Sequence, residues 1–496
     1  MPFLIDTVFE ESLKYLDEMP KAKRKEIGQF FTSVETARYM ASMFDSPKKQ
    51  DITVLDAGAG SGILTAAAVE RLQTENVSHI KVVCYETSED VLPMLKSNLS
   101  FLKEKSVVPL DYEIKEENYI TTQSSDFNES MFSNPDAVKY DWIIGNPPYK
   151  KIPKDAVEAL SMPSVCYGAP NLYFLFASMA LFNLDVEGEM VYIIPRSWTS
   201  GAYFKSFRDY LFQEGTLRQI HLFVSRDKVF EKESVLQETI IIKVDKSADK
   251  GSVKITSSNS NSDFENINVI EVPYENIVFG SEKYVYLVTT EEELNVLKVL
   301  GKWTNTLPSL GIKMKTGLTV DFRSWDYLKN EQGDNTVPLF YSQHIKDGRV
   351  VFPIQKEYEY ITTERAGLIQ RNKNYLFVKR FTSKEERRRL QCGIYLSSDF
   401  PEYESISTQN KVNFIDGLTF DLSVEQVYGL YVLFNSSIYD LYYRILNGST
   451  QVNSTEVNAM PVPTLKEIEQ LGVALLKEND LSVDACDRVL EVLING

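Results

Sequence analysis

The sequence predicts an α/β fold in which a mostly parallel sheet carries helices on both faces, followed by a second half of mixed α/β structure. Three observations lead to this class. From residue 50 onward, short apolar runs alternate with amphipathic stretches. A glycine-rich loop, "DAGAGSG" at 56–62, separates the first apolar run from the first amphipathic stretch. Beyond about residue 265 the alternation is lost, so the two halves are expected to be built differently.

Strands and helices are expected in βα order through the first half. The strand-like runs begin the stretches "ITVLDAGAGSG" (52–62), "IKVVCYE" (80–86), "YDWIIGNPPY" (140–149) and "GEMVYIIPRSW" (188–198). Helical patterns follow the first two, in "ILTAAAVERLQ" (63–73) and "VLPMLKSNLSFL" (91–102). Strands that alternate with helices at this spacing are typical of a parallel sheet, because each helix carries the chain back to the same edge.

Chain length and a change of composition predict two domains, over residues 1–250 and 265–496. A chain of 496 residues is longer than one ordinary hydrophobic core supports. Near 245–265 the sequence becomes polar and rich in serine and asparagine. Such composition is typical of a domain boundary, and it can also include a connecting hairpin.

The composition is that of an ordinary globular protein, 43% hydrophobic and 25% charged. No apolar run approaches the roughly 18 residues of a membrane span. The first residues carry acidic side chains where an export signal is basic, so we expect a cytoplasmic, prokaryotic-type chain with no membrane partner. The four cysteines lie far apart and there are only three histidines, so neither disulfides nor a metal site is expected.

The glycine-rich loop and the next strand indicate a nucleotide site. Glycines between a strand and a helix let backbone N–H groups approach a ligand at the helix N-terminus. The second strand ends in Glu86, where an acidic side chain can hydrogen-bond ribose hydroxyls. A tight connection and a surface carboxylate are the plain alternatives. The two features alone do not separate a nicotinamide dinucleotide from S-adenosylmethionine, since both contain adenosine.

The tetrapeptide Asn146-Pro147-Pro148-Tyr149 separates these cofactors. Two prolines in a row remove two backbone donors and fix φ, so neither helix nor sheet continues. The Asn146 amide oxygen and the Pro147 carbonyl can accept hydrogen bonds from an exocyclic amine, which directs the lone pair of that amine at an electrophilic methyl group. Tyr149 can stack on the base that carries the amine. A proline-terminated edge strand with an asparagine cap explains the prolines alone.

Together these elements resemble the γ-class amino-methyltransferases of bacterial restriction-modification systems, which methylate N6 of adenine in DNA; the TaqI, PstI and BsuBI methyltransferases are members. The resemblance covers most of the chain and implies a Rossmann-like catalytic domain with S-adenosylmethionine as cofactor, followed by a target-recognition domain. It also implies cofactor contacts from Thr32 in "GQFFT" (28–32), from the glycine-rich loop and Glu86, and from Asn146. The loop residues are Asp56, Gly58, Gly60 and Gly62. "NLYFLF" (171–176) corresponds to the helix that lines the cofactor pocket.

Two further positions follow from the resemblance. "DKVFEKESVLQETIII" (227–242) is similar to the block that gives a second aromatic face for the target base, which makes Phe230 the candidate. The family often has Asp-Phe-Leu beside the cofactor adenine. This chain has Asn118-Tyr119-Ile120 instead, so Asn118 is expected to bond the adenine edge without a charge, and Glu117 is the competing choice.

The implied reaction needs an adenine that is flipped out of the duplex. The base would lie between Tyr149 and Phe230, with N6 held by Asn146 and Pro147. The amine then attacks the sulfonium methyl in line and leaves S-adenosylhomocysteine. No strong base and no metal is needed, because the alkylated amine loses its proton readily.

Contacts to double-stranded DNA must come from local basic patches, since the net charge is −17. Residues 365–392 hold nine basic side chains against two acidic ones, a mixture suited to phosphate contacts. "LNGSTQVNSTEVNAMPVP" (446–463) resembles a stretch of the PstI- and BsuBI-like recognition domains, and its amides suit adenine. A solvated helix face and helix-cap chemistry are the alternatives. The candidate DNA contacts are Lys379, Arg380, Lys384, Arg387, Arg388, Gln451 and Asn453.

The resemblance implies DNA bound between the two halves and, through PstI and BsuBI, a CTGCAG-type target. No nuclease-like cluster of carboxylates and lysine stands out, so we expect a modification enzyme whose cognate endonuclease is a separate chain. Three alternatives stay open: an N-methyltransferase that acts on RNA or on a protein glutamine amide, a non-catalytic DNA-binding protein with this fold, and a nicotinamide oxidoreductase. The C-terminal half argues against the first, the intact tetrapeptide against the second, and the lack of a hydride-acceptor site against the third.

Overall fold

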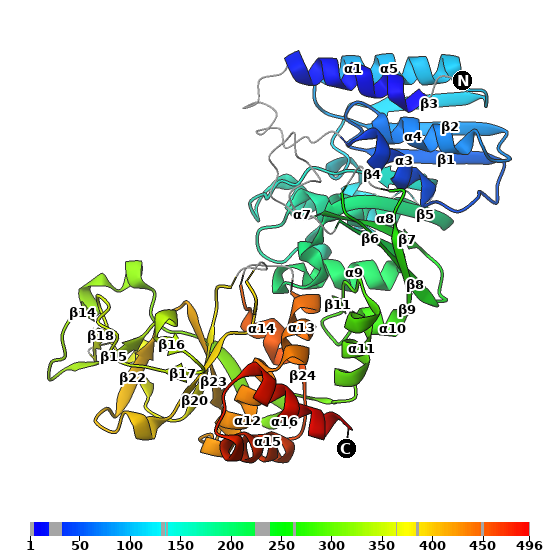
Figure 1. Cartoon of the computed structure of the whole chain (residues 1–496). Coiled ribbons are helices and arrows are strands. Elements are labelled where there is room, and N and C mark those ends of the chain that lie inside the picture. The colour runs from blue at the N-terminus through cyan, green and yellow to red at the C-terminus, as the bar shows by residue number, and fades with distance from the viewer. Residues whose placement is uncertain are drawn as a thin grey trace. The chain divides into compact units, whose positions relative to one another are not determined.

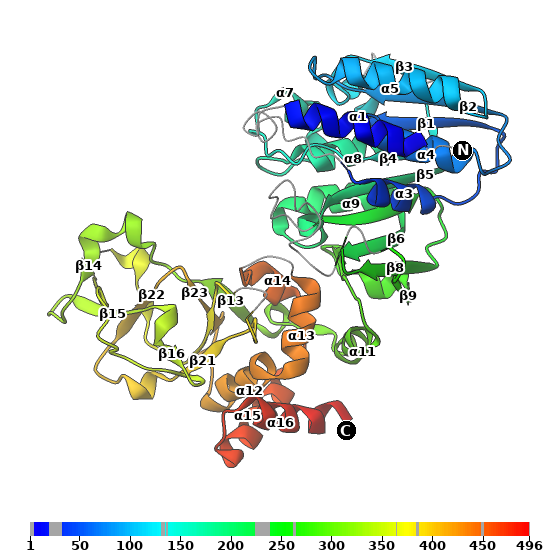
Figure 2. The same ribbon diagram turned by 45° about the horizontal axis from the view of Figure 1, so that its top comes forward.

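The computed structural model of the chain describes residues 4–18, 32–129, 134, 137–223, 239–260, 264–363, 365–382, 386–447 and 451–495. The chain forms two compact units, Met1–Thr289 and Thr290–Gly496, which are drawn in Figures 1 and 2. Among these described residues, no helix has both the length and the apolar character to cross a membrane.

The first unit is built on a nine-stranded sheet in the order β3-β2-β1-β4-β5-β7-β6-β8-β9. Every strand runs in one direction except β7 and β9. The strands are β1 (Asp51–Ala57), β2 (His79–Tyr85), β3 (Leu110–Lys115), β4 (Tyr140–Gly145), β5 (Leu184–Pro195), β6 (Thr216–Phe223), β7 (Thr239–Asp245), β8 (Ser252–Ser258) and β9 (Asn268–Pro273). This mostly parallel sheet confirms the predicted fold class, and the predicted strand-like runs form β1, β2, β4 and β5.

Helices cover both faces of this sheet (Figures 1 and 2). They are α1 (Leu4–Glu18), α3 (Val34–Ser42), α4 (Ile63–Leu72), α5 (Leu92–Lys105), α6 (Ser124–Phe127), α7 (Val157–Ser161), α8 (Leu172–Asn183), α9 (Lys205–Glu214) and α10 (Tyr274–Ile277). One core joins α1, α3, α4 and α5 to alternate side chains of the central strands, among them Trp142 and Ile144. The residues between them point to the opposite face, as period-two strands require. The central strands are therefore apolar on both faces, as in parallel sheets generally.

Strand order reverses between β1 and β4, because β2 and β3 lie on one side of β1 and β4 and β5 lie on the other. At such a reversal the connections leave in opposite directions, and a crevice opens beyond the carboxyl ends of the strands. Gly58, Glu86 and Asn146 are each the first residue after β1, β2 and β4, respectively. The fold therefore brings three predicted site residues to one edge of the sheet.

The first unit ends later than the predicted boundary near 245–265. The segment that looked like a linker contains β8 and β9, which pair with each other in antiparallel register. β8 also pairs with β6, so the hairpin extends the sheet. Only one face of this hairpin is strongly apolar, with Val253, Ile255 and Val272 buried while Lys254 and Glu271 beside them are exposed, which explains its linker-like composition. β10 (Val278–Phe279) and β11 (Tyr284–Val285) complete the unit.

The second unit holds two mixed sheets and a group of helices. One sheet has the order β13-β23-β20-β21-β17-β16 and the other has β14-β18-β15-β22-β19. The strands are β12 (Asn305–Thr306), β13 (Ile312–Thr316), β14 (Leu328–Lys329), β15 (Thr336–Phe340), β16 (Ile345–Lys346), β17 (Arg349–Val350), β18 (Tyr360–Thr362), β19 (Gln370–Arg371), β20 (Tyr375–Lys379), β21 (Cys392–Tyr395), β22 (Ser405–Thr408), β23 (Val412–Gly417) and β24 (Pro461–Val462). The helices are α11 (Glu291–Leu300), α12 (Val424–Asn435), α13 (Ser437–Leu446), α14 (Ser454–Ala459), α15 (Leu465–Glu478) and α16 (Val483–Asn495).

Candidate active site

The glycine-rich loop after β1 is shaped by backbone torsions that favour glycine. Gly58, Gly60 and Gly62 have φ of +75°, +56° and +80°, values that side chains with a Cβ atom rarely adopt. The N–H groups of Gly58 and Ala59 donate to the Tyr85 carbonyl, over 2.9 and 3.0 Å. These two hydrogen bonds fix the loop to the end of β2. The turn needs a positive φ at three alternate positions, which explains the spacing of the glycines.

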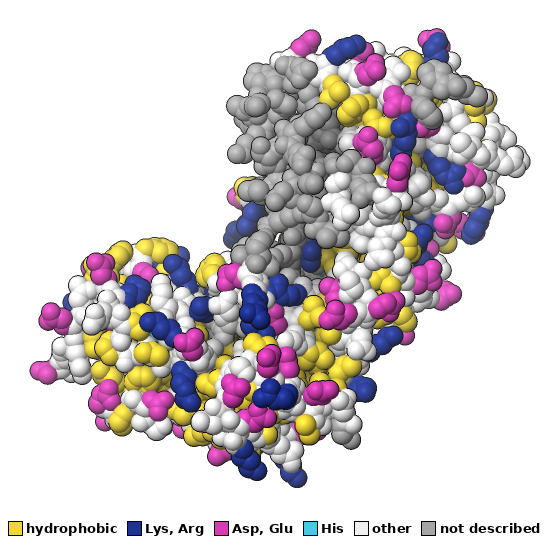
Figure 3. All heavy atoms as spheres, viewed as in Figure 1, with side chains coloured by type: hydrophobic (Ala, Val, Ile, Leu, Met, Phe, Trp, Pro, Cys, Tyr) yellow, Lys and Arg dark blue, Asp and Glu magenta, His cyan; other side chains and the backbone are white. Residues whose placement is uncertain are grey.

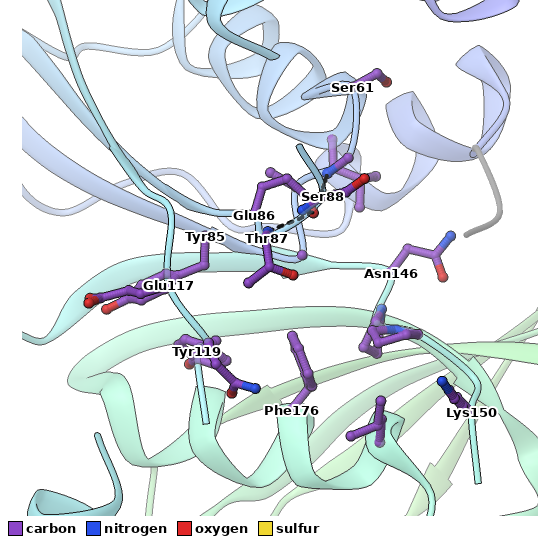
Figure 4. Close-up of a pocket in the computed structure, with 18 of the residues that line it drawn as sticks. Ser61, Tyr85, Glu86, Thr87, Ser88, Glu117, Tyr119, Asn146, Lys150 and Phe176 are labelled. Atoms are coloured by element: carbon purple, nitrogen blue, oxygen red, sulfur yellow. Dashed lines mark hydrogen bonds between the residues drawn. The ribbon is translucent and has the colours of Figure 1, made fainter. Parts of the chain in front are cut away.

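A pocket of about 290 Å³ lies at this edge of the sheet. Its lining includes Thr32, Gly58, Gly60, Glu86, Glu117, Asn118, Asn146, Pro147, Pro148, Lys150 and the α8 residues Leu172 and Phe176. Figure 4 shows Phe176 pointing from α8 into the pocket, with Glu86 and Asn146 on separate chain segments above this helix. The rings of Tyr85, Tyr119 and Phe176 follow one another at centroid distances of 4.8 and 5.5 Å, with their planes inclined by 63° and 45°, which gives one wall an apolar aromatic lining.

Glu86 is held by three backbone donors. Gly60 N–H donates to its Oε2 over 3.0 Å, and Thr87 and Ser88 N–H each donate to its Oε1 over 2.8 Å. Its side chain is 7% exposed and reaches the pocket. Hydrogen bonds from backbone N–H groups fix the carboxylate in position before any ligand arrives, and they couple the glycine-rich loop to the end of β2.

Asp56 and Gly62, both predicted cofactor contacts, do not line the pocket. Gly62 instead caps the start of α4. Asp56 is 1% exposed and accepts a hydrogen bond from the Thr65 hydroxyl over 2.8 Å, while its Oδ1 has no hydrogen-bond partner among the described residues. Burial raises the pKa of Asp56 from its ordinary value of 3.8 to about 7, and the nearby Glu86 charge adds to this.

Burial of Asp56 predicts a stability that falls with rising pH. Between pH 3.8 and about 7 the folded chain holds a proton on Asp56 that the unfolded chain has lost. At ~1.4 kcal/mol per pH unit, this single group lowers the free energy of unfolding by roughly 4 kcal/mol across that range, with no further change above it. Asp56→Asn, which is neutral at every pH, is expected to remove this slope. Chemical denaturation of both proteins at several pH values checks it, and parallel pH profiles would contradict it.

Asn146 is fixed by two hydroxyl groups. Its Nδ2 donates to Thr32 Oγ1 over 3.1 Å, and its Oδ1 accepts from the Tyr149 hydroxyl over 2.7 Å. The carbonyl of Ile193 lies 3.0 Å from the same hydroxyl. Thr32 and Tyr149 are 3% and 9% exposed. The prolines hold the backbone while these contacts hold the amide, so the predicted nucleophile-binding group is preorganised.

Gly145 has a structural constraint that the sequence does not reveal. It ends β4 and pairs with Tyr192 of β5. A Cβ atom at Gly145 would lie 2.7 Å from Tyr192 Cζ, closer than real contacts allow. The buried tyrosine ring therefore fills the space beneath Gly145, immediately before Asn146. The pairing of β4 with β5 is a long-range contact, so the local sequence "IIGNPPY" holds no signal for it.

Asn118 lines the pocket, but its amide is used within the protein. Its Oδ1 accepts from the N–H groups of Ile120 and Thr121, and its Nδ2 donates to Glu158 Oε1 over 2.9 Å. Glu117, the competing residue, also lines the pocket and is exposed. Which of them meets an adenine ring stays a prediction. The predicted second aromatic Phe230, residues 28–31 and Lys384 lie outside the described residues.

Comparison of the sequence with known proteins identifies the family to which the chain belongs. Residues 71–230 match the family model described as "Eco57I restriction-modification methylase". The type II methyltransferase M.BsuBI of Bacillus subtilis is 34% identical over 96% of this chain and 96% of its own length. The chain belongs to the type II restriction-modification methyltransferases. M.PstI of Providencia stuartii is 33% identical over 95% of this chain and 92% of its own length.

The fold of this methyltransferase also occurs among solved structures. The type IIL restriction-modification enzyme MmeI, solved in complex with DNA, superposes with a TM-score of 0.51 at 13% identity, over 96% of this chain and 69% of that one. At that identity the likeness concerns the fold alone.

The pocket of the methyltransferase fits S-adenosylmethionine, the methyl donor of the family. A Cβ atom built on Gly60 would meet no atom within 4 Å, so the loop leaves open space where a ligand can approach the backbone. Glu86 offers a fixed carboxylate and the Tyr85–Tyr119–Phe176 wall offers an apolar surface. The lining therefore suits a ligand with ribose hydroxyls and an apolar ring.

Glu86→Gln is expected to lower the affinity of the methyltransferase for S-adenosylmethionine by about 10- to 100-fold, because the amide turns a donor toward backbone donors and loses a charged acceptor. Isothermal titration calorimetry measures the change. Glu116→Gln, which removes a charge from an exposed side chain outside the pocket lining, serves as the matched control and is expected to bind the cofactor as wild type does. Equal affinities for wild type and Glu86→Gln would contradict the assignment.

In the second unit, two predicted DNA-contact segments lie together. Arg380 Nη2 donates to Gln451 Oε1 over 3.2 Å, and Phe381 and Gln451 form an isolated β-bridge. Lys379 donates to Gln391. Asn453 occupies the N-cap of α14, yet its side chain makes no capping hydrogen bond. Figure 3 shows Lys and Arg side chains gathered near α14 on the face in view.

Part of the basic run stabilises the second unit instead of facing solvent. Arg388 is half-buried, and its Nη2 donates to the carbonyls of Phe434 and Ser436 at the end of α12, over 3.3 and 3.1 Å. Arg389 is fully buried and donates to Thr382 and Asn447. Arg387 is exposed. Arg388 and Arg389 therefore have structural contacts that the charge pattern did not reveal, while Arg387 and the Arg380–Gln451 pair are accessible for a ligand.

Proposed function

We propose that this methyltransferase transfers the methyl group of S-adenosylmethionine to N6 of adenine in double-stranded DNA. The observation that carries the proposal is the Asn146-Pro147-Pro148-Tyr149 turn at the end of β4, whose first three residues line the same pocket as Glu86. Such a turn offers hydrogen-bond acceptors, and an exocyclic amine is the donor that they suit. Family membership as a restriction-modification methyltransferase supports DNA as the carrier of that amine.

The residues of this chain orient the nucleophile. Asn146 Oδ1 and the Pro147 carbonyl accept the two N–H groups of the amine, so its lone pair turns toward the cofactor side of the pocket. S-adenosylmethionine supplies an electrophilic sulfonium methyl when bound. Thr32 holds the Asn146 amide from behind. Tyr149, with Phe230 as its proposed partner, lies against the plane of the flipped base, which leaves the duplex because its amine is unreachable inside the stack.

The chain is expressed in a methylation-deficient bacterial host, and the host genome is sequenced by a long-read method that detects both N6-methyladenine and N4-methylcytosine. One short motif, methylated at adenine at nearly every occurrence, is the expected result, and a CTGCAG-type motif is the specific expectation. Methylation at cytosine N4 would overturn the adenine assignment. An unmodified genome from a host that makes the folded protein would overturn DNA as the substrate.

We also propose that the cognate endonuclease is a separate chain and that this enzyme protects host DNA from it. DNA from the expressing host is expected to resist an endonuclease that cuts the methylated motif, and DNA from a host with the Asn146→Ala variant is expected to be cut. Equal cleavage of both samples would contradict a protective role.

A further inference from the structure

Two large aromatic side chains of the second unit, separated by only two residues, are exposed. Phe322 is 70% exposed and Trp325 is 56% exposed, with exposed Arg323 between them. A single exposed apolar residue is ordinary. Two aromatic rings within four residues are different, because each ring would gain from burying most of its surface. The loop 321–325 therefore presents a surface that is suited to a partner.

The loop is held in a fixed shape. Two short helical turns, Asp321–Arg323 and Trp325–Tyr327, form its backbone, and Ser324 between them is buried. Gln409 Nε2 donates to Asp321 Oδ2 over 3.1 Å. The Trp325 ring meets the edge of the Tyr358 ring at a centroid distance of 5.4 Å. Because the backbone and one ring are already anchored, the rings can bind a partner at little additional cost in conformational entropy.

Hydrogen bonds connect this loop to the predicted DNA contacts. Thr319, at the foot of the loop, bridges to Gln409. The N–H of Arg380 donates to the Lys411 carbonyl, and Arg380 Nη1 donates to the Asn410 carbonyl over 3.0 Å. Arg380 in turn bonds Gln451. The segments near 319–321, 409–411, 380–381 and 451 are therefore neighbours in the fold.

The aromatic and basic side chains that these neighbouring segments leave exposed or half-buried are called here the aromatic strip: Phe322, Arg323, Trp325, Arg380, Phe381 and Lys411. Phe381 is 46% exposed and Lys411 is exposed. Asp321, the acidic residue at its start, is hydrogen-bonded to Gln409, and Asp326 stands at its other end. Rings interleaved with cations suit a polyanion that also offers flat faces for stacking, which is the chemistry of nucleic acid.

We propose that the aromatic strip contacts the DNA duplex, with Phe322 or Trp325 entering the groove against base steps and with Arg323 and Lys411 at phosphates. The inference rests on the proposed function and extends it to residues outside the basic run at 365–392. A DNA-modifying enzyme that extrudes a base must compensate for lost stacking, and apolar side chains inserted at base steps are one way in which proteins stabilise deformed DNA.

The test compares the full-length wild type with Phe322→Ala/Trp325→Ala. Fluorescence anisotropy measures binding to a short duplex that carries the motif found by genome sequencing, with S-adenosylhomocysteine present. The double variant is expected to bind about 10- to 100-fold more weakly. Val473→Ala/Leu476→Ala removes two exposed apolar side chains from α15 of the same unit, 38% and 37% exposed, and is expected to bind as wild type does.

Two further readouts separate contact from misfolding. Arg323→Ala is expected to lower the slope of log affinity against log salt concentration by about one, as for a lost phosphate contact. The thermal unfolding midpoint of each variant is expected to match that of wild type. A wild type that neither binds nor methylates the duplex would overturn the proposed function. An active wild type together with unchanged affinity of Phe322→Ala/Trp325→Ala would overturn only the present inference, including the case in which the strip binds another protein.

Discussion

Replacing Asn146 with alanine is expected to lower the rate of methyl transfer by about 100- to 1000-fold, the usual loss when a preorganised polar group at the reacting atom is removed. The affinity for S-adenosylmethionine is expected to stay nearly unchanged, because the Glu86 carboxylate is held by the backbone N–H groups of Gly60, Thr87 and Ser88 and not by Asn146. Single-turnover methylation of duplex DNA measures the rate, and calorimetry measures the affinity.

The control for this variant is Thr32→Ser, which keeps the hydroxyl that accepts from Asn146 Nδ2. Its rate is expected to remain close to that of wild type, whereas Thr32→Val removes the acceptor and is expected to lower the rate at saturating cofactor. If Asn146→Ala kept more than about a tenth of the wild-type rate, the proposed role of the amide in orienting the amine would be wrong.

Gly145→Ala is expected to have the second-largest effect, although Gly145 meets no ligand. The new methyl group would lie 2.7 to 3.0 Å from atoms of the buried Tyr192 ring. Overpacking of this kind costs about 1–3 kcal/mol of stability. The strain is relieved most readily by a shift of the end of β4, which carries Asn146 with it. Because a displacement of ~1 Å can cost about 100-fold in rate, the methylation rate is expected to fall by roughly that factor.

A matched control lies in the same sheet. Gly215→Ala would place a Cβ atom 2.7 Å from Val244 Cγ1, at the start of β6 and outside the pocket lining. It is expected to lower the thermal midpoint as Gly145→Ala does and to leave the methylation rate per folded molecule unchanged. Tyr192→Leu in the Gly145→Ala background removes the clashing ring edge and is expected to recover part of the rate. Equal rate losses for both glycine variants would show that general destabilisation is the cause.

The sequence allowed the catalytic half of the site to be predicted because its signals are local. The glycines that adopt positive φ, the acidic residue that ends β2 and the two prolines after β4 each constrain their own stretch of chain, and parallel strands bring those stretches to one edge. Asp56 and Asn118 were harder to interpret. Asp56 accepts a hydrogen bond from Thr65, and Asn118 accepts one from the Ile120 N–H. A polar residue that makes such hydrogen bonds within the protein cannot be distinguished, from the sequence, from one that contacts a ligand.

In the second unit, the sequence pattern of basic residues does not predict which of them are exposed. Adjacent arginines in "ERRRL" look like one exposed charged face, yet Arg389 is fully buried and Arg388 binds carbonyls at the end of α12. Thr382 precedes Arg389 by seven residues, but Phe434, Ser436 and Asn447 lie about 50 residues later in the chain, so no local rule could identify these later partners. The polar composition of 245–265 predicts a domain boundary that can include a hairpin. The hairpin β8–β9 instead extends the sheet of the first unit, because β8 pairs with β6, a strand distant in sequence.

The hydrogen bond from the Tyr149 hydroxyl to Asn146 affects whether the Asn146 amide stabilises the bound substrate or the transition state. With no base present, it donates to the Asn146 oxygen that the target amine needs. The Ile193 carbonyl lies 3.0 Å from the same hydroxyl, so the hydroxyl can turn to it when an amine N–H replaces it at Asn146. Such an exchange of one hydrogen bond for another adds little to the affinity for the ground state. As the nitrogen becomes positively charged during methyl transfer, its N–H groups become stronger donors than a tyrosine hydroxyl. The contact then favours the transition state over the bound substrate, which is the condition for raising the turnover rate and not merely the occupancy.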